Sequence, residues 1–181
     1  MKLSIIVPLT DDQGYLDSLR SIIQISLPQG HSYELVLVKE FDPSGLHKVA
    51  EKPEAQLFMY PKSSLSQKFE AGAFQAKGDI FYFLMPGYLP PFDFASRIIK
   101  ACENDMKVGT IPGKWLQRFC WCFSSIRLEK IVINLLKVNN LMISRTLFSR
   151  THGFRWDGKD RSLNHLMVNA LPNPSNTILI S

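Results

Sequence analysis

The sequence predicts an α/β protein whose central sheet is mainly parallel and carries helices on both faces. Short apolar segments, with the length and composition of buried strands, recur along the first half of the chain. Segments with helical spacing of apolar residues and turns rich in Gly and Pro lie between them. The predicted strands of this half are 3–7, 34–38, 55–60 and 80–84. Alternating strands and helices are typical of a parallel sheet covered by helices.

The chain opens with a strand followed by a helix. Residues 3–7 are mostly β-branched or apolar, and Pro8 bounds them. Asp11 and Asp12 precede a helical segment at 13–25, and an Asp side chain is a good N-cap because it accepts a hydrogen bond from a free backbone N–H. The Leu and Ile residues of this segment recur every three to four positions, which predicts one buried helix face.

A helix with small residues precedes the fourth strand. Residues 66–76 include Ala71 and Gly72, which allow a helix to pack closely on a sheet. Gly78 is predicted to end this helix, since glycine readily adopts the left-handed backbone of a helix C-terminus. The sequence Met-Pro-Gly-Tyr at 85–88 ends the fourth strand.

The second half of the chain has shorter predicted elements and an aromatic, basic region at 114–137. That region has two interpretations, an interfacial helix on a membrane or aromatic residues that cover the sheet while basic residues face water. The other predicted elements are helices at 94–102, 146–150 and 162–171 and strands at 108–111, 141–143 and 178–180.

Composition narrows the class of protein. The 181 residues are 45% hydrophobic and 20% charged, which is typical of a globular chain with a sizeable core. Cys102, Cys120 and Cys122 are a poor disulfide framework and a weak zinc motif. No segment has the features of a signal peptide or the roughly 20 apolar residues of a membrane span. We expect a cytoplasmic protein, with peripheral contact at the inner face of the membrane through 114–137 as one alternative.

Positive charge is concentrated toward the C-terminal end. Residues 1–106 carry 10 Lys/Arg against 13 Asp/Glu, a net charge of −3, whereas residues 107–181 carry 11 against 3, a net charge of +8. A phosphate-bearing substrate, an anionic membrane or nucleic acid would suit a basic surface, and a solvated basic face explains it equally well. No stacked-aromatic or helix-turn-helix signature accompanies the charge, so we expect no nucleic acid partner.

Function is expected where the parallel strands end, because ligands of open parallel sheets bind at the carboxyl ends of the strands. The residues there form part of five ordered segments. These are Ile5-Ile6-Val7-Pro8 with Asp11-Asp12, Val38-Lys39-Glu40, Glu70-Ala71-Gly72 up to Gly78-Asp79, Leu84-Met85-Pro86-Gly87 up to Leu89-Pro90, and Met142-Ile143-Ser144-Arg145 with His152-Gly153-Phe154 and Lys159-Asp160.

In this order the segments resemble the family-2 glycosyltransferases, whose GT-A fold is a nucleotide-binding α/β sheet with an acceptor-binding part. The resemblance implies a single GT-A-like domain over 1–181, with a nucleotide-binding half at 1–91 and an acceptor-side half at 92–181. It also implies a nucleotide or nucleotide sugar as the ligand and an acceptor that the sequence does not identify.

The resemblance assigns roles to individual residues. Pro8, Leu9, Asp11 and Glu40 would contact the nucleotide, with the Glu40 carboxylate recognising uracil, and Asp160 would be the base that takes the proton of the acceptor hydroxyl. Structural interpretations remain open beside these roles. Asp11 suits a helix cap, Glu40 a solvated loop acid, and Asp160 the N-terminus of a helix, where its charge is favourable with the dipole.

The family's metal motif, Asp-x-Asp, is absent. Its carboxylates hold a divalent ion that neutralises the diphosphate, and Met85 and Gly87 stand in their places. Methionine offers a soft thioether and glycine offers no side chain, so we expect no metal cofactor. Lys62 and Lys68 would then meet the phosphates as point charges.

Two functions follow from these residues. The first is a glycosyltransferase-like protein that binds a nucleotide sugar and performs inverting, metal-independent sugar transfer. The alternative is a catalytically inactive glycosyltransferase homologue that acts as a binding or scaffolding module. The sequence leaves open whether the protein is an enzyme.

Overall fold

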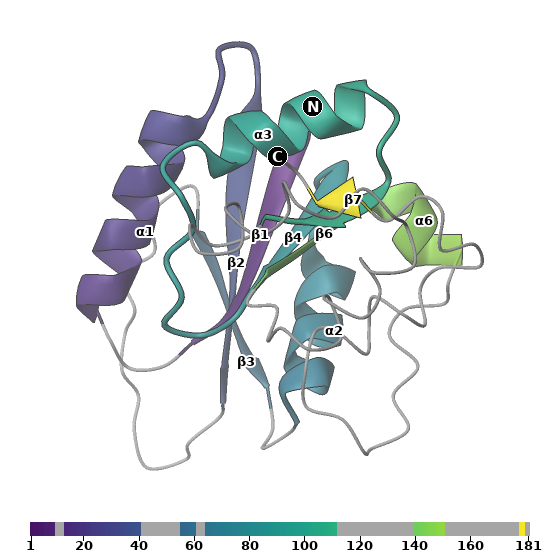
Figure 1. The fold of residues 1–181 in the computed structure, drawn as a ribbon. Helices are drawn as coiled ribbons and strands as arrows, with labels where there is room; N and C mark the ends of the chain where they lie inside the picture. Colours follow the sequence, from purple (N-terminus) through teal and green to yellow (C-terminus); the bar gives the residue numbers. More distant parts are fainter. Residues whose placement is uncertain (10–12, 41–54, 61–63, 112–139, 151–177, 180–181) are drawn as a thin grey trace.

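The computed structural model describes residues 1–9, 13–40, 55–60, 64–111, 140–150 and 178–179 (Figure 1). Seven strands form one sheet in the order β3-β2-β1-β4-β6-β5-β7. The strands are β1 (Lys2–Pro8), β2 (Ser32–Glu40), β3 (Ala55–Tyr60), β4 (Ile80–Leu84), β5 (Val108–Thr110), β6 (Asn140–Ser144) and β7 (Ile178–Leu179). The helices of the described part are α1 (Gln13–Ser26), α2 (Leu65–Gln75), α3 (Phe94–Glu103) and α6 (Arg145–Arg150).

The first four strands are parallel, as the sequence predicts. β1 pairs with β2 and β4, and β2 pairs with β3. β6 is antiparallel to both β4 and β5, while β7 is parallel to β5. The prediction of a mainly parallel sheet is therefore confirmed. The direction of β6 was not predicted, because a short apolar segment pairs equally well in either direction.

Helices cover both faces of the sheet, which is also confirmed. α1 and α3 pack on the face that contains Ile5, Leu35 and Tyr82, whereas α2 and α6 pack on the face that contains Ile6 and Val36. Figure 1 shows α1 on the left of the sheet and α2 and α6 on the right. Successive residues of a strand point to opposite faces, so a strand in the middle of this arrangement must be apolar at nearly every position.

α2 lies close against the sheet and starts at a defined cap. A Cβ built on Gly72 would lie 2.5 Å from Ile6 Cγ2 and 3.1 Å from Val38 Cγ2, so only glycine allows this approach. At the start of the helix, the Ser64 side chain accepts from the Gln67 N–H, and the Gln67 side chain accepts from the Ser64 N–H at 2.9 Å. This capping box satisfies two backbone donors of the first turn.

Gly78 does not end α2 in the predicted way. The helix C-cap is Ala76, whose backbone is extended. A Cβ on Gly78 would instead lie 2.4 Å from Ser4 Oγ and 2.6 Å from the Lys2 carbonyl oxygen. Glycine is needed here for close approach to β1. The sequence could not separate this role from a helix cap, because glycine serves both.

The predicted and observed bounds differ by two residues or fewer. The largest difference is β2, which extends two residues beyond 34–38 at each end. The predictions at 114–137 and 162–171 lie outside the described residues. Within the described ranges no helix is long and apolar enough to cross a membrane.

Candidate functional site

The carboxyl ends of the parallel strands meet at one edge of the sheet, toward the bottom of Figure 1. This carboxyl edge consists of Pro8–Leu9, Lys39–Glu40 and Met85–Tyr88, which follow or end β1, β2 and β4. The antiparallel β6 begins at the same edge, because its first residue, Asn140, pairs with Leu84 at the end of β4. Open parallel sheets bind ligands at such an edge, so the carboxyl edge is the candidate site.

The end of β1 lies at the centre of the carboxyl edge, between β2 and β4. Pro8 is buried and pairs with Val38 of β2, and the Leu9 N–H donates to the Val38 carbonyl oxygen at 2.8 Å. The Leu9 amide is therefore used by the sheet. Neighbouring strands lie roughly 4.8 Å apart, so the ends of β2 and β4 are separated by about 10 Å across β1.

Glu40 and Lys68 form an ion pair at the end of β2. Lys68 Nζ lies 2.9 Å from Glu40 Oε2, and the exposed fractions of the two side chains are 16% and 42%. Lys68 reaches Glu40 from the first turn of α2, which the capping box places at this edge. An ion pair this exposed typically stabilises a fold by only 0.2–1 kcal/mol. Its geometry instead presents a hydrogen-bond acceptor and a donor side by side.

Met85, Pro86, Gly87 and Tyr88 form a type II β-turn. The Tyr88 N–H donates to the Met85 carbonyl oxygen at 3.1 Å, and φ of Gly87 is +74°. A proline ring suits the second position of this turn, and the positive φ of the third position suits glycine. Gly87 is exposed, and a Cβ built on it would meet nothing within 4 Å. Met85 and Gly87, which the resemblance places at an acidic pair, thus lie in a tight turn whose glycine is exposed.

Contacts from α1 and β6 hold this turn in place. Tyr15 Oη donates to the Tyr88 carbonyl oxygen at 3.1 Å, and the Tyr88 side chain hydrogen-bonds to Asn140. Asn140 is buried. Its Oδ1 accepts from the Ile111 N–H at 2.8 Å and from Thr110 Oγ1 at 3.0 Å, and its Nδ2 donates to the Ile111 carbonyl at 3.0 Å. Tyr15, a core residue of α1, therefore connects the turn to the hydrophobic core.

Three phenols lie beneath the turn and remain protonated. Burial raises the pKa of Tyr15. Burial also raises the pKa of Tyr88, although its hydrogen bond with Asn140 lowers it in part. Burial and the nearby Tyr88 and Tyr15 raise the pKa of Tyr82 well above its ordinary value. The buried Tyr82 hydroxyl has no hydrogen-bond partner within the described structure, and its ring stacks on Phe94 with centroids 5.2 Å apart.

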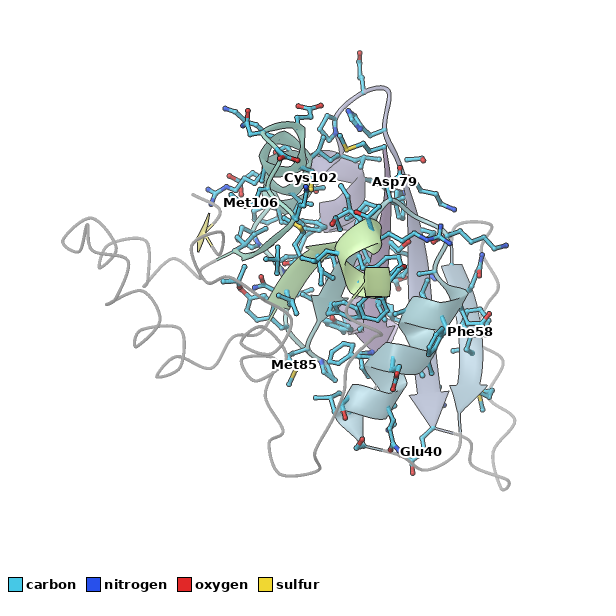
Figure 2. All side chains as sticks on the ribbon, turned by 90° about the vertical axis from the view of Figure 1, so that its right-hand side faces the viewer. Glu40, Phe58, Asp79, Met85, Cys102 and Met106 are labelled. Carbon is cyan, nitrogen blue, oxygen red and sulfur yellow. The ribbon has the colours of Figure 1, made fainter. Side chains whose placement is uncertain are left out.

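The described residues at the position of the metal motif do not fit a hard divalent ion. Met85 carries a thioether and Gly87 carries no side chain, whereas Mg²⁺ and Mn²⁺ prefer oxygen ligands. Figure 2 shows Met85 at the same edge as Glu40. Among the residues that the structure describes, no group of three or more His, Cys, Asp or Glu side chains could hold a metal ion. The absence of a metal cofactor from the protein stays a prediction, because it concerns all residues of the chain and not only the described ones.

The carboxyl edge brings together a part of the predicted site. Four of the predicted residues lie there, whereas Asp11 and Asp160 lie outside the described residues. The four are Pro8, Leu9, Glu40 and Lys68. Tyr15 and Asn140 were missed. Tyr15 lies on the buried face of the first helix, where it reads as a core residue. Asn140 comes just before a predicted strand, and its polar side chain at that position was its only signal in the sequence.

Several solved structures resemble the chain, and they include a mannosyltransferase and a glucosyl-3-phosphoglycerate synthase. Mannosyltransferase PcManGT from Pyrobaculum calidifontis, in complex with GDP-Man and Mn²⁺, matches with a TM-score of 0.70 and 14% identity, over 98% of this chain and 54% of that chain. S. aureus TarS 1-349 matches with a TM-score of 0.67 and 15% identity, over 98% and 57%. Glucosyl-3-phosphoglycerate synthase from Mycobacterium tuberculosis, with Mn²⁺, UDP and phosphoglyceric acid, matches with a TM-score of 0.53 and 12% identity, over 82% and 57%.

These similarities show that the chain has the GT-A fold. The chain spans about half the length of the solved structures that it matches. A scan against family models finds no match, and a search of curated proteins finds none either. At 14–15% identity the similarity establishes the fold, and the function must be argued from the site.

Proposed function

We propose that the carboxyl edge binds a nucleotide sugar and that the chain is a glycosyltransferase-like protein. The observation that carries this proposal is the Glu40–Lys68 ion pair, which stands at the end of β2 in a GT-A fold. Structures of the same fold are described in complex with GDP-Man, UDP-GlcNAc and UDP, which supports a nucleotide as the ligand.

The Glu40–Lys68 pair suits a base whose edge has a carbonyl next to a ring N–H. Uracil and guanine both have such an edge, so Glu40 would accept from the N–H while Lys68 donates to the carbonyl oxygen. Adenine and cytosine lack the ring N–H. In the orientation that places the ring nitrogen at Glu40, they would set the carboxylate against an acceptor, which is unfavourable. Lys68 is thereby assigned to the base, and not to the phosphates as expected from the sequence alone.

Transfer, in this proposal, is inverting and independent of a divalent metal. Asp160 would act as the base that deprotonates the acceptor hydroxyl, which suits a carboxylate. The absence of carboxylates from the Met85–Tyr88 turn supports the metal-free part of the proposal. The same absence favours the alternative, a homologue that binds a nucleotide sugar without transferring the sugar and serves as a binding or scaffolding module.

Calorimetric titration of UDP, GDP, ADP and CDP in EDTA tests the binding proposal. We expect UDP or GDP to bind and ADP and CDP to bind far more weakly. Glu40→Gln should weaken the preferred nucleotide roughly tenfold or more, because it removes a charged acceptor. Glu103→Gln, an exposed carboxylate on α3 away from the carboxyl edge, is the matched control. No binding of any nucleotide at millimolar concentration, or an absolute need for Mn²⁺, would contradict the proposal.

Assays of UDP-sugar and GDP-sugar hydrolysis or transfer in EDTA separate an enzyme from a binding module. If turnover is seen, Asp160→Asn should abolish it, and full activity of that variant would remove Asp160 from the role of base. Binding without turnover would favour the module. Co-sedimentation with anionic vesicles tests the proposed membrane contact through 114–137.

A further inference from the structure

We propose that the backbone N–H of Gly87, on the Met85–Tyr88 turn, binds the diphosphate of the ligand directly and does so without a metal ion. This inference rests on the proposed function, because it concerns the phosphates of the same nucleotide. It adds a binding group that the sequence did not indicate, and it makes the replaced acidic pair part of the site.

The position of the turn suits the phosphate part of a nucleotide. Glu40 ends β2 and Met85 follows β4, and these two strands flank β1, so the strands lie about 10 Å apart at the carboxyl edge. Figure 2 shows the two residues on the same side of the molecule. This separation is of the order of the distance from the edge of a base to the phosphates of its nucleotide. A base held by Glu40 and Lys68 would therefore direct its diphosphate toward the turn.

The chemistry of the turn suits an anion. The Gly87 N–H makes no hydrogen bond within the described part of the chain, and the residue is exposed. Glycine lets a ligand approach the backbone closely, and hydrogen bonds from backbone N–H groups to phosphate oxygens are strengthened by the charge. The turn carries no carboxylate. An anion therefore meets no repulsion there that a metal ion would have to neutralise.

The turn is also held in one conformation before any ligand binds. The ring of Pro86 restricts the backbone, the Tyr88 N–H closes the turn, and Tyr15 Oη holds the Tyr88 carbonyl oxygen. The Tyr88 side chain also lies near the buried Asn140, which lowers the pKa of Tyr88 in part. Binding to a group that is already ordered costs less conformational entropy, so a single amide donor contributes more to the affinity than it would on a mobile loop.

Nitrogen–proton NMR of the whole chain, titrated with inorganic pyrophosphate and with UDP in EDTA, tests this inference. Gly87→Ala identifies the Gly87 resonance. We expect this amide to shift and to saturate with both ligands. Gly30 is the matched control: it has a similar backbone, with φ +78°, is exposed in the turn between α1 and β2, and has nothing within 4 Å of a built Cβ. Its amide lies at the opposite edge and should not shift.

Two variants test the role of the preformed turn. Tyr15→Phe removes the hydroxyl that holds the Tyr88 carbonyl and should weaken pyrophosphate binding about three- to tenfold, the usual effect of losing one neutral hydrogen bond. Tyr82→Phe removes a hydroxyl of the same cluster that has no hydrogen-bond partner among the described residues, and it should leave pyrophosphate affinity unchanged.

The outcomes separate this inference from the proposed function. If UDP binds by calorimetry while the Gly87 amide does not shift, or shifts only with Mn²⁺, the inference is wrong and the nucleotide site remains. If Gly30 responds as strongly as Gly87, the turn is no specific site for phosphate and the inference is also wrong. If pyrophosphate shifts Gly87 but no nucleotide binds, the turn binds phosphate and the proposed function fails.

Discussion

At the amino edge of the sheet the glutamate of a glutamate–lysine pair is buried and its carboxylate accepts four hydrogen bonds, whereas at the carboxyl edge the glutamate of a pair of the same residue types is 42% exposed. Glu34 Oε2 lies 2.5 Å from Lys2 Nζ. Its Oε1 accepts from Ser4 Oγ at 2.6 Å, from the Lys77 N–H at 2.5 Å and from the Gly78 N–H at 3.1 Å. This carboxylate joins β1, β2 and the connection between α2 and β4.

The carboxyl edge shows the opposite arrangement. The Glu40 side chain is 42% exposed and has Lys68 as its ion-pair partner, and the N–H of the exposed Gly87 makes no hydrogen bond within the described part of the chain. In Figure 2, Glu40 and Asp79 lie at opposite ends of the sheet. A carboxylate with four protein donors has no capacity left for a ligand, so the amino edge is structural. The pair and the amide at the carboxyl edge keep that capacity.

The largest effect expected from this comparison is on the two glutamates. Glu34→Ala leaves Lys2, Ser4 and the Lys77 N–H without their acceptor, while the Gly78 N–H keeps Ser4 Oγ, so it should lower the free energy of unfolding by about 3 kcal/mol. Glu40→Ala should lower it by less than about 1 kcal/mol, since an exposed pair contributes little. Urea unfolding of both variants measures this. Equal losses would show that the two edges do not differ in their structural role.

Substitution of Gly78 at the amino edge should cost more folding stability than substitution of Gly87 at the carboxyl edge. Gly78→Ala places a Cβ against Ser4 and the Lys2 backbone, which should cost about 2 kcal/mol or more of folding stability. Gly87→Ala meets open space, and its cost of about 1 kcal/mol comes from the positive φ alone. Thermal unfolding of the two variants distinguishes crowding from backbone strain. A larger loss for Gly87→Ala would contradict the comparison.

A part of the pH dependence of folding stability should come from Glu34. Burial alone would raise the pKa of Glu34, but hydrogen bonds from Lys2, Ser4 and the Lys77 N–H, together with the charge of Lys2, outweigh burial and lower it. The stability from this group is therefore present above the unfolded pKa of about 4.3 and is lost as the pH falls through the lower folded-state pKa. Urea midpoints measured across that range should fall more steeply for the wild type than for Glu34→Gln. Parallel curves would rule this out.

The smallest effects are expected for the phenols beneath the turn. Tyr15→Phe should cost about 1 kcal/mol, because the Tyr88 carbonyl loses its donor. Tyr82→Phe should cost nothing or stabilise slightly, since the hydroxyl that it removes has no partner within the described structure. Chemical unfolding of the two variants provides the measurement. A clear loss for Tyr82→Phe would mean that an ordered water or another group satisfies this hydroxyl.

Much of the fold could be predicted because its signals are local. The continuous apolar character of 3–7, 34–38 and 80–84 indicates strands that are buried on both faces, and the helical spacing at 13–25 indicates the helix between the first two. The ends of β2 were missed because its last residues, Lys39 and Glu40, are charged. Such residues fit the exposed end of a strand as well as they fit a loop.

The site could be predicted only in part. Glu40 and Lys68 were each identified, but their contact was not, because it depends on where α2 crosses the sheet. Asn140 gave almost no signal. Its hydrogen bonds with Thr110 and Ile111 join β6 to β5, and no local pattern in the sequence specifies that pairing.

The α/β class, the order of strands and helices in the first half, and the lack of carboxylates at Met85 and Gly87 can be read from the sequence alone. These features depend on residue type and on spacing within about one element. Three features depend on the tertiary structure. Lys68 pairs with Glu40, Gly78 allows close packing on β1, and Tyr15 donates a hydrogen bond to the Met85–Tyr88 turn. These features depend on contacts between residues far apart in the chain, which only the packing of helices on the sheet brings together.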